Sequence, residues 1–322
     1  MQKALRRFRQ GGGWRLLWTY ARMGVLPYVL KVTVSGVIHG ESYKAIYGKF
    51  RNRIAALLQE KYAGKVASLI DATAELKEEK GERKIWFCWM QGMDSAPDLV
   101  KACLNSVRRH AKDREVIVLD GTNYVEWVQL PEHVVRKYQQ GMIPPVMYAD
   151  LLRLALLVRY GGTWTDATVL CTADIPEEIM TSRLFIFRYI QRCTGRVTGM
   201  SNWFITSCKN NRLLSVLQEV LYQYWRDFAC VADYYIFHLF FGVIAREMPE
   251  ALREMPRMNS YNAILLQEKL NLAYPNAQYD SFTARVPIHK LSYRLPQSVS
   301  DNPHNIYHEI LREYLTENDE IC

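Results

Sequence analysis

The chain has 322 residues and a mass of 37.6 kDa, and it is 49% hydrophobic and 23% charged, as expected of a globular protein with one large or two modest domains. This composition excludes a disordered chain, a collagen-like repeat and a small disulfide scaffold. The formal net charge of +8 is uneven, because residues 1–53 hold 11 Lys and Arg against Glu41 alone, whereas the other 269 residues hold 30 basic and 32 acidic residues. A nucleic-acid-binding domain more usually spreads its basic residues over the folded body, so we expect no nucleic-acid partner.

The basic N-terminal segment is interspersed with apolar side chains such as Phe8, Trp14 and Trp18. Two interpretations stay open: residues 1–53 contact an anionic inner-membrane surface, or they form a solvated basic face packed on the domain. A signal peptide is not expected, because Arg15 and Arg22 interrupt the apolar residues and no small-residue cleavage site follows. No window reaches the roughly 18 uninterrupted apolar residues of a transmembrane helix.

Cysteine usage points to a reducing compartment. The seven cysteines are odd in number and scattered, with no C-x-x-C pair, and most lie in apolar surroundings. We therefore expect a cytoplasmic protein that is peripheral to the inner face of the cell membrane if the first interpretation of residues 1–53 holds.

Hydrophobic periodicity divides the chain into a basic helical extension over residues 1–80 and an α/β domain over residues 81–322 with helices at its C-terminal end. A strand, a helix and a second strand follow one another with short connections, which indicates parallel pairing and a mixed sheet flanked by helices. The predicted helices cover residues 41–63, 66–80, 98–110, 147–160, 213–228, 233–246, 263–270 and 305–316, and the predicted strands cover 84–90, 115–120 and 163–172.

The most unusual stretch begins with the helix over residues 147–160, which is apolar nearly all round and is therefore expected to be buried. Asp150 and Arg153 are costly residues in such a helix unless something pairs with them, and their i, i+3 spacing places both on one face. Gly161 and Gly162 end the helix, because glycine accepts the left-handed conformation of a C-cap.

A length estimate connects this helix with the strand that follows. The helix from Arg153 to its end spans about 10 Å and the strand from Gly162 to Asp166 about 13 Å. If the strand runs back along the helix, two carboxylates and a guanidinium meet at one point of an apolar layer. The alternative is an ordinary buried ion pair of Asp150 with Arg153 and a strand-end Asp166 that faces water.

Residues 149–153 (ADLLR) and 160–168 (YGGTWTDAT) resemble the central signature of the capsular polysaccharide synthesis proteins, which are relatives of glycosyltransferase family 32 and of the clostridial toxin glucosyltransferases. The resemblance covers roughly residues 84–292 and includes 85–92 (IWFCWMQG), 96–106 (APDLVKACLNS), 201–204 (SNWF), 233–238 (DYYIFH) and 288–291 (IHKL).

This resemblance implies a GT-A-like fold, a nucleotide-sugar donor and a divalent cation, Mn²⁺ or Mg²⁺. Asp166 matches the first aspartate of the DxD motif, which touches ribose and metal. Thr168 stands at the second aspartate position and offers the metal no carboxylate. Asp150 and Arg153 match residues that hold the hydroxyls of the donor sugar and the phosphate side.

The remaining nucleotide-sugar residues that the resemblance implies are Trp89 stacked on the base, Gln91 in the same segment, Trp164 beside the ribose and Asn202 near the sugar. His289 is a candidate for a third metal ligand or a phosphate contact, although an isolated histidine after an apolar run is more often structural. For Asp233 and His238 we favour core packing or shaping of the acceptor site over catalysis.

The resemblance implies a glycosyltransferase that moves a sugar, expected to come from a UDP-sugar, onto a capsular or other cell-surface polysaccharide or a lipid-linked acceptor. Divalent-metal dependence and retention of configuration are expected with it. The alternative is a nucleotide-sugar or glycan-binding scaffold that has lost its metal site. Threonine at position 168, in place of the second aspartate, favours this alternative. A phosphohydrolase is disfavoured because Asp166 lacks a second acid two residues on. A Rossmann oxidoreductase is disfavoured because residues 91–94 (QGMD) are not a glycine-rich turn.

Overall fold

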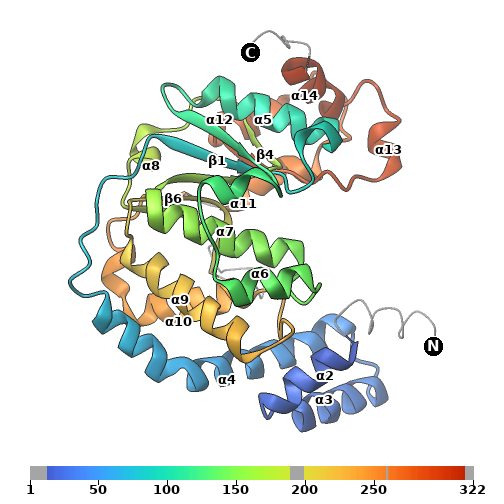
Figure 1. Cartoon of the computed structure of the whole chain (residues 1–322). Helices are drawn as coiled ribbons and strands as arrows, with labels where there is room; N and C mark the ends of the chain where they lie inside the picture. The colour runs from blue at the N-terminus through green and yellow to red at the C-terminus, as the bar shows by residue number, and fades with distance from the viewer. Residues whose placement is uncertain (1–12, 189–198, 259, 316–322) are drawn as a thin grey trace. The chain divides into compact units, whose positions relative to one another are not determined.

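The computed structural model describes residues 13–188, 199–258 and 260–315 (Figure 1). The chain divides into two compact units that alternate along the sequence. Unit 1 comprises Met1–Leu76, Leu130–Ala155 and Arg212–Pro249, and unit 2 comprises Lys77–Gln129, Leu156–Asn211 and Glu250–Cys322. The boundary that the sequence predicts at residue 80 lies near the first change of unit, whereas the later returns to unit 1 have no counterpart in the sequence pattern.

Unit 1 is helical in the part that the structure describes. Its helices are α2 (Gly13–Arg22), α3 (Leu26–Ile38), α4 (Tyr43–Ala72), α6 (Glu132–Gln139), the first part of α7 (Pro145–Tyr160), α9 (Arg212–Asp227) and α10 (Ile236–Glu247). Helices α4, α9 and α10 pack side by side (Figure 1). Tyr62 of α4 lies at their centre, because its ring meets Phe240 of α10 edge-on at 5.0 Å and its hydroxyl donates to Asp227 of α9 at 2.7 Å.

Helix α4 corrects the predicted pair of helices over residues 41–63 and 66–80. It is one continuous helix of 30 residues, with the Ser42 side chain accepting a hydrogen bond from Ala45 N at its start. A single glycine inside a helix, here Gly64, costs about 1 kcal/mol and does not break it. The chain leaves the helical conformation after Ala72, and Glu79 instead pairs with Lys209 through two backbone hydrogen bonds.

Unit 2 contains a five-stranded mixed sheet in the order β2-β1-β3-β6-β5. Its strands are β1 (Lys84–Cys88), β2 (Glu115–Leu119), β3 (Gly162–Asp166), β5 (Leu184–Arg188) and β6 (Met200–Ser207). Strand β1 runs parallel to both β2 and β3, whereas β6 runs antiparallel to β3 and β5. The predicted α/β fold with a mixed sheet flanked by helices is thereby confirmed.

Helices cover this sheet over a continuous apolar core that includes Ile85, Phe87, Val100 and Phe204. Helix α5 (Asp98–His110) agrees with its predicted span and packs against α14 (Ile306–Leu315) and β4 (Val169–Cys171). The shorter helices are α8 (Glu177–Met180), α11 (Ser260–Leu265), α12 (Ala277–Arg285) and α13 (Gln297–Ser300), and the 3₁₀ turns are η1 (Met93–Ser95), η2 (Asn123–Glu126), η3 (Pro249–Leu252) and η4 (Leu266–Glu268).

The single strand predicted over residues 163–172 is wrong, because the chain turns at Ala167 and Thr168. This turn separates β3 from β4, and β4 pairs antiparallel with β7 (Ile288–Lys290) in a second sheet of two strands. Thr168 is held at the junction, since its carbonyl oxygen accepts a hydrogen bond from Leu291 N at 2.8 Å. The turn therefore brings the end of β3 next to a segment more than 100 residues further along the chain.

The start of β3 depends on three glycines. Gly161 and Gly162 adopt φ values of +67° and +83°, in the left-handed region that favours glycine. A Cβ atom on Gly161 would lie 2.6 Å from Gly81 Cα and 2.8 Å from Lys209 N. The absence of side chains at this point thus permits the close backbone approach that positions β3.

We predict that Gly161→Ala lowers the free energy of unfolding by at least about 2 kcal/mol, because the new methyl group meets both a strained φ and backbone atoms. Gly64→Ala is the matched control, since a Cβ there meets nothing within 4 Å and alanine favours the helix. Denaturant unfolding of both variants checks this. Equal stability of Gly161→Ala and the wild type would contradict the proposed role of the close approach.

Candidate functional site

Asp166 is the last residue of β3 and lies at the carboxyl edge of the parallel strands. Its register partner in β1 is Cys88, so the two strands end together. Trp164 lies two residues earlier on the same face of β3, and its indole Nε1 donates to Asp166 Oδ1 at 3.0 Å. The Asp166 side chain is 27% exposed, so a ligand at this edge can reach its carboxylate.

Lys290 lies beside Asp166, although nothing in the sequence pattern indicated it as a site residue. Its Nζ donates to Asp166 Oδ2 at 3.0 Å and to Thr168 Oγ1 at 2.7 Å. Strand β7 positions it, because Lys290 is the register partner of Val169 in β4. No local sequence motif connects Lys290 with Asp166 and Thr168, because they lie 124 and 122 positions away in the chain.

Two residues that the sequence predicts to bind the nucleotide sugar follow β1 at the same edge. Trp89 comes directly after Cys88, and its ring meets Tyr293 edge-on at 5.3 Å. The buried Trp89 Nε1 has no hydrogen-bond partner among the described residues, so its N–H is an unsatisfied donor at this edge. Gln91 is exposed in the turn that follows, where its carbonyl oxygen accepts a hydrogen bond from Ser95.

Asn202 is brought to this edge by the antiparallel register of β6. Phe204 pairs with Thr165, so the residues that precede Phe204 lie alongside the end of β3 and the turn after it. Unit 2 thus gathers six of the predicted site residues at one edge of its sheet: Trp89, Gln91, Trp164, Asp166, Thr168 and Asn202.

Asp150 and Arg153 form a buried ion pair in unit 1. Arg153 Nη1 donates to Asp150 Oδ1 at 2.7 Å, and the guanidinium carbon lies 5.9 Å from the centre of the Phe237 ring. The i, i+3 spacing indicated this pair. Its predicted meeting with Asp166 stays a prediction, because the pair belongs to unit 1 and Asp166 to unit 2.

Asp233 serves the packing of unit 1, in agreement with the interpretation favoured from the sequence. Its fully buried carboxylate accepts hydrogen bonds from Tyr235 N at 2.7 Å, from the Tyr47 hydroxyl at 3.0 Å and from Arg51 Nε at 3.2 Å. The Arg51 guanidinium lies over the rings of both tyrosines, 4.8 Å from Tyr47 and 4.3 Å from Tyr235. Burial beside Asp233 raises the pKa of Tyr47 to about 12.

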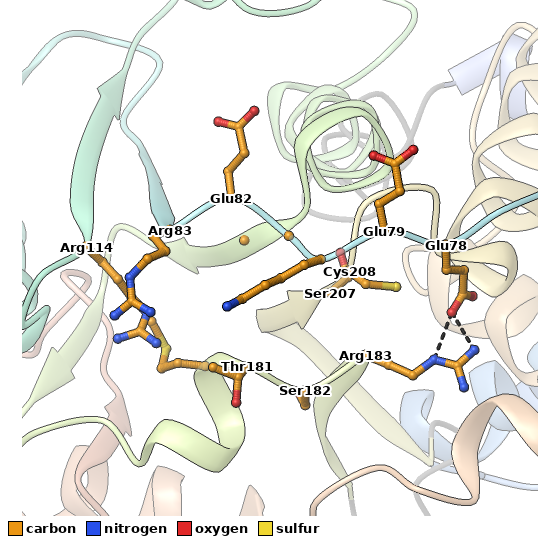
Figure 2. A pocket seen from close by; sticks show the side chains of 14 residues that line it. Glu78, Glu79, Glu82, Arg83, Arg114, Thr181, Ser182, Arg183, Ser207 and Cys208 are labelled. Carbon is orange, nitrogen blue, oxygen red and sulfur yellow. Dashed lines mark hydrogen bonds and ion pairs between the residues drawn. The ribbon is translucent and has the colours of Figure 1, made fainter.

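A pocket of about 300 Å³ lies at the opposite edge of the sheet, where β1 and β3 begin (Figure 2). Three arginines line it, but carboxylates pair with them: Arg83 pairs with Asp113, Arg114 Nη2 lies 2.7 Å from Glu177, and Arg183 Nη2 lies 2.5 Å from Glu78. Glu79 and Glu82 add negative charge and Lys80 adds a positive charge, so the lining holds no excess of unpaired arginines. This pocket is therefore a poor candidate for binding a diphosphate, and the candidate site is the edge that carries Asp166.

Comparison with known proteins identifies the family. The model of the capsular polysaccharide synthesis protein family matches residues 35–310. The chain belongs to this family. The match extends well beyond the central signature in both directions, which confirms the resemblance predicted from the sequence.

The chain is also similar to known glycosyltransferases. It is 25% identical to the O-glycosyltransferase PaGT of Phomopsis amygdali over 171 residues, which cover 48% of this chain and 42% of PaGT. The chain thus spans less than half the length of that relative. Among solved structures it is similar to the PaToxG glycosyltransferase, with a TM-score of 0.35, 14% identity, and coverage of 80% of this chain and 96% of that one. The sequence similarity to PaGT makes this chain a glycosyltransferase-like member of its family.

The residues around Asp166 do not fit the divalent cation that the family resemblance implies. Hard divalent cations take several oxygen ligands, carboxylates foremost. Here Asp166 contributes one carboxylate, Thr168 contributes a neutral hydroxyl, and the ammonium group of Lys290 lies against both. Within residues 13–188, 199–258 and 260–315, no group of three or more His, Cys, Asp or Glu side chains could hold a metal ion.

His289, the third residue predicted for the metal, is fully buried, and its Nε2 lies 3.2 Å from the Thr172 hydroxyl. Because side chains alternate along a strand, His289 and its neighbour Lys290 point to opposite faces of β7. Burial lowers the pKa of His289 to about 4, which keeps the imidazole neutral at pH 7. Lys290, and not His289, is the neighbour of Asp166.

The pKa of His238 in unit 1 generates a prediction about acid stability. Burial, together with the charges of Arg153 and Arg51, lowers this pKa to about 3. The unfolded chain binds a proton at this histidine near its ordinary pKa of about 6.5, whereas the folded chain does not. The free energy of unfolding therefore falls as the pH is lowered from about 6.5 toward 3.

We expect His238→Phe to weaken this acid dependence, with a difference from the wild type on the order of 2 kcal/mol at pH 4.5 relative to pH 7. Because carboxylates also titrate in this pH range, the pH dependence of the wild type alone does not isolate the contribution of His238. A control variant at another histidine is therefore needed. His304→Phe changes an exposed histidine and is the control. Thermal unfolding across this pH range is the measurement, and identical pH profiles for wild type and His238→Phe would refute the assignment.

Proposed function

We propose that this protein is a glycosyltransferase that moves a sugar from a nucleoside diphosphate donor to a hydroxyl group of a polysaccharide or a lipid-linked glycan. The observation that carries the proposal is the Asp166 carboxylate, held by the Trp164 indole and the Lys290 ammonium at the carboxyl edge of the sheet. Ligands of α/β sheets bind at this edge. The family and the likeness to PaGT support the same reaction class.

The reaction breaks the bond between the anomeric carbon of the sugar and the diphosphate oxygen, and the electron pair remains on the diphosphate. A bond forms between the anomeric carbon and the acceptor oxygen, whose hydroxyl proton passes to the leaving diphosphate or to water. Negative charge grows on the diphosphate as its bond breaks, so a positive group placed there stabilises the transition state. A divalent cation, when bound, supplies such a charge in DxD-type transferases.

Each residue at this edge has a chemistry suited to the donor. The Asp166 carboxylate accepts hydrogen bonds, and the Trp164 N–H fixes its orientation at 3.0 Å, so it can accept from the ribose hydroxyls. The Trp89 ring can stack on the base, and its indole N–H is available as a donor. UDP as the nucleotide, retention of configuration and sugar contacts by Asp150 and Arg153 follow from the family resemblance and are part of this proposal.

A binding scaffold without turnover is the competing function, and Thr168 in place of a second aspartate favours it. Incubation with a panel of UDP- and GDP-sugars separates the two. A transferase slowly releases free nucleoside diphosphate by hydrolysing its donor, whereas a scaffold binds the donor and leaves it intact.

We predict that Asp166→Asn keeps the fold, since the amide is nearly isosteric, and lowers donor turnover by at least about 100-fold, because the carboxylate that orients the donor and Lys290 is lost. Asp174→Asn is the matched control, because Asp174 is an exposed aspartate paired with His110 and Lys112. Nucleotide release and thermal unfolding are measured on both. Full turnover by Asp166→Asn would exclude Asp166 from the site.

A further inference from the structure

Lys290 has the geometry of a phosphate-binding group. An ammonium group has three N–H donors, of which Asp166 Oδ2 takes one and Thr168 Oγ1 another. The third donor has no further partner among the described residues, and the side chain is 25% exposed, so a ligand can reach it. Its two fixed partners restrict the rotamers of a flexible side chain, which lowers the entropy cost of binding a further acceptor.

The identity of residue 168 sets the charge of this cluster. Asp166 and Lys290 neutralise one another, and Thr168 adds a hydrogen-bond acceptor without charge. An aspartate at position 168 would make the cluster negative and would repel a diphosphate unless a divalent cation were added. With threonine, the ammonium group can face the diphosphate directly.

We propose that the ammonium group of Lys290 supplies the positive charge on the donor diphosphate that a divalent cation supplies in DxD-type transferases. This inference rests on the proposed function. It makes Lys290 a catalytic residue, since its third N–H touches the leaving diphosphate and stabilises the charge that grows there. Donor binding and turnover then need no added metal.

The binding experiment uses calorimetry of the full chain with UDP, GDP and uridine, each in EDTA and in Mn²⁺. We expect the diphosphates to bind in EDTA, with Mn²⁺ changing the affinity less than about threefold. Lys290→Met should weaken diphosphate binding by about 30-fold, the scale of one charge-assisted hydrogen bond, and leave uridine binding unchanged. Lys290→Arg keeps the charge and should restore most of the affinity.

The control is Lys209→Met, which removes a partly exposed lysine whose Nζ lies 3.2 Å from Glu79 and should leave binding unchanged. The double variant Thr168→Asp with Lys290→Ala should acquire a requirement for Mn²⁺. Thermal unfolding of each variant separates loss of the fold from loss of the site.

Two negative results differ in meaning. If neither UDP nor GDP binds the wild type under any condition, the proposed function and the role of Lys290 both fall. If a diphosphate binds only with Mn²⁺, and Lys290→Met binds it equally well, the role of Lys290 alone is overturned and a metal-dependent transferase remains.

A separate observation in unit 1 concerns the surface of α3. Leu30, Val34, Val37 and Ile38 are 53%, 58%, 70% and 74% exposed. Their spacing of i, i+4, i+7 and i+8 places them on one face of the helix, where a surface helix ordinarily carries polar residues. We call these four residues the apolar stripe of α3.

The opposite face of α3 is already occupied. Gly36 packs so closely on α4 that a Cβ atom there would lie 2.5 Å from Ile46 Cγ1. Helix α2 contacts α3 and adds two exposed tryptophans one turn apart, Trp14 and Trp18. In the described part of the chain, no single helix is long and apolar enough to span a membrane, and α2 and α3 pass that test only as a pair bent by 118°.

We infer that the apolar stripe of α3, together with Trp14 and Trp18, docks on an anionic lipid bilayer with the helices lying in its surface. Charge complementarity favours an anionic lipid surface over a second copy of this chain. Residues 1–53 carry 11 basic residues and one acidic residue, so the same segments of two copies would repel one another. Exposed tryptophan beside basic side chains is also typical of the membrane interface. A lipid-linked acceptor would then be anchored in the same bilayer on which the stripe docks.

Flotation of the full chain with phosphatidylcholine vesicles, with and without about 30% phosphatidylserine, tests this surface. We expect binding to the anionic vesicles, a blue shift of tryptophan fluorescence, and at least about tenfold weaker binding by Val37→Asp with Ile38→Asp. Val125→Asp, at an apolar residue of unit 2 that is 53% exposed, is the control. Absence of vesicle binding, binding that the stripe variant leaves unchanged, or a stripe-dependent dimer that ignores vesicles would overturn the inference.

Discussion

The candidate site depends on the parallel register of β1 and β3. Cys88 and Asp166 are partners at the end of this pairing, so Trp89 and Asp166 reach the same edge of the sheet. The start of β3 is held by Gly161, whose left-handed conformation ends α7 and whose carbonyl oxygen accepts a hydrogen bond from Trp86 Nε1 at 3.0 Å. A shift of one residue in this register would turn Asp166 toward the other face of the sheet.

The second determinant is the turn after β3, because it joins the edge of the main sheet to β4 and β7. Lys290 reaches Asp166 because β7 pairs with β4 and because Leu291 N donates a hydrogen bond to the carbonyl oxygen of Thr168. A carboxylate and an ammonium group that are each about a quarter exposed keep part of their hydration, so bringing them together costs less than a fully buried ion pair would. The Asp166–Lys290 pair therefore costs the folded state little desolvation energy and stays accessible to a ligand.

How much the sequence could predict depended on the range of each interaction. Helix α5 was predicted to the residue, since its amphipathic period and the preceding Pro97 are local signals. Asp166 could be singled out because the length estimate draws it level with Asp150 and Arg153, and because the surrounding signature resembles a family. The break after β3 was missed, because residues 163–172 (TWTDATVLCT) are rich in β-branched residues and hold no glycine or proline to mark the turn at Ala167 and Thr168.

Lys290 shows why the rest of the site could not be predicted. Of the adjacent pair His289 and Lys290, chemistry alone favoured the histidine as a metal ligand. Which of the two faces Asp166 is decided by the register of a three-residue strand with β4, and that pairing leaves no trace in the local sequence. Strands β5 and β6 went unpredicted as well, although their pairing carries Asn202 to the site edge.

The most direct test of this account is a crystal structure of the full chain with UDP and Mn²⁺, recorded with anomalous data for manganese. The account predicts the diphosphate at the carboxyl edge of the sheet, with a phosphate oxygen within hydrogen-bond distance of Lys290 Nζ and no manganese signal at Asp166. A manganese ion bound to Asp166 would contradict the role of Lys290. A nucleotide bound away from this edge would contradict the site itself.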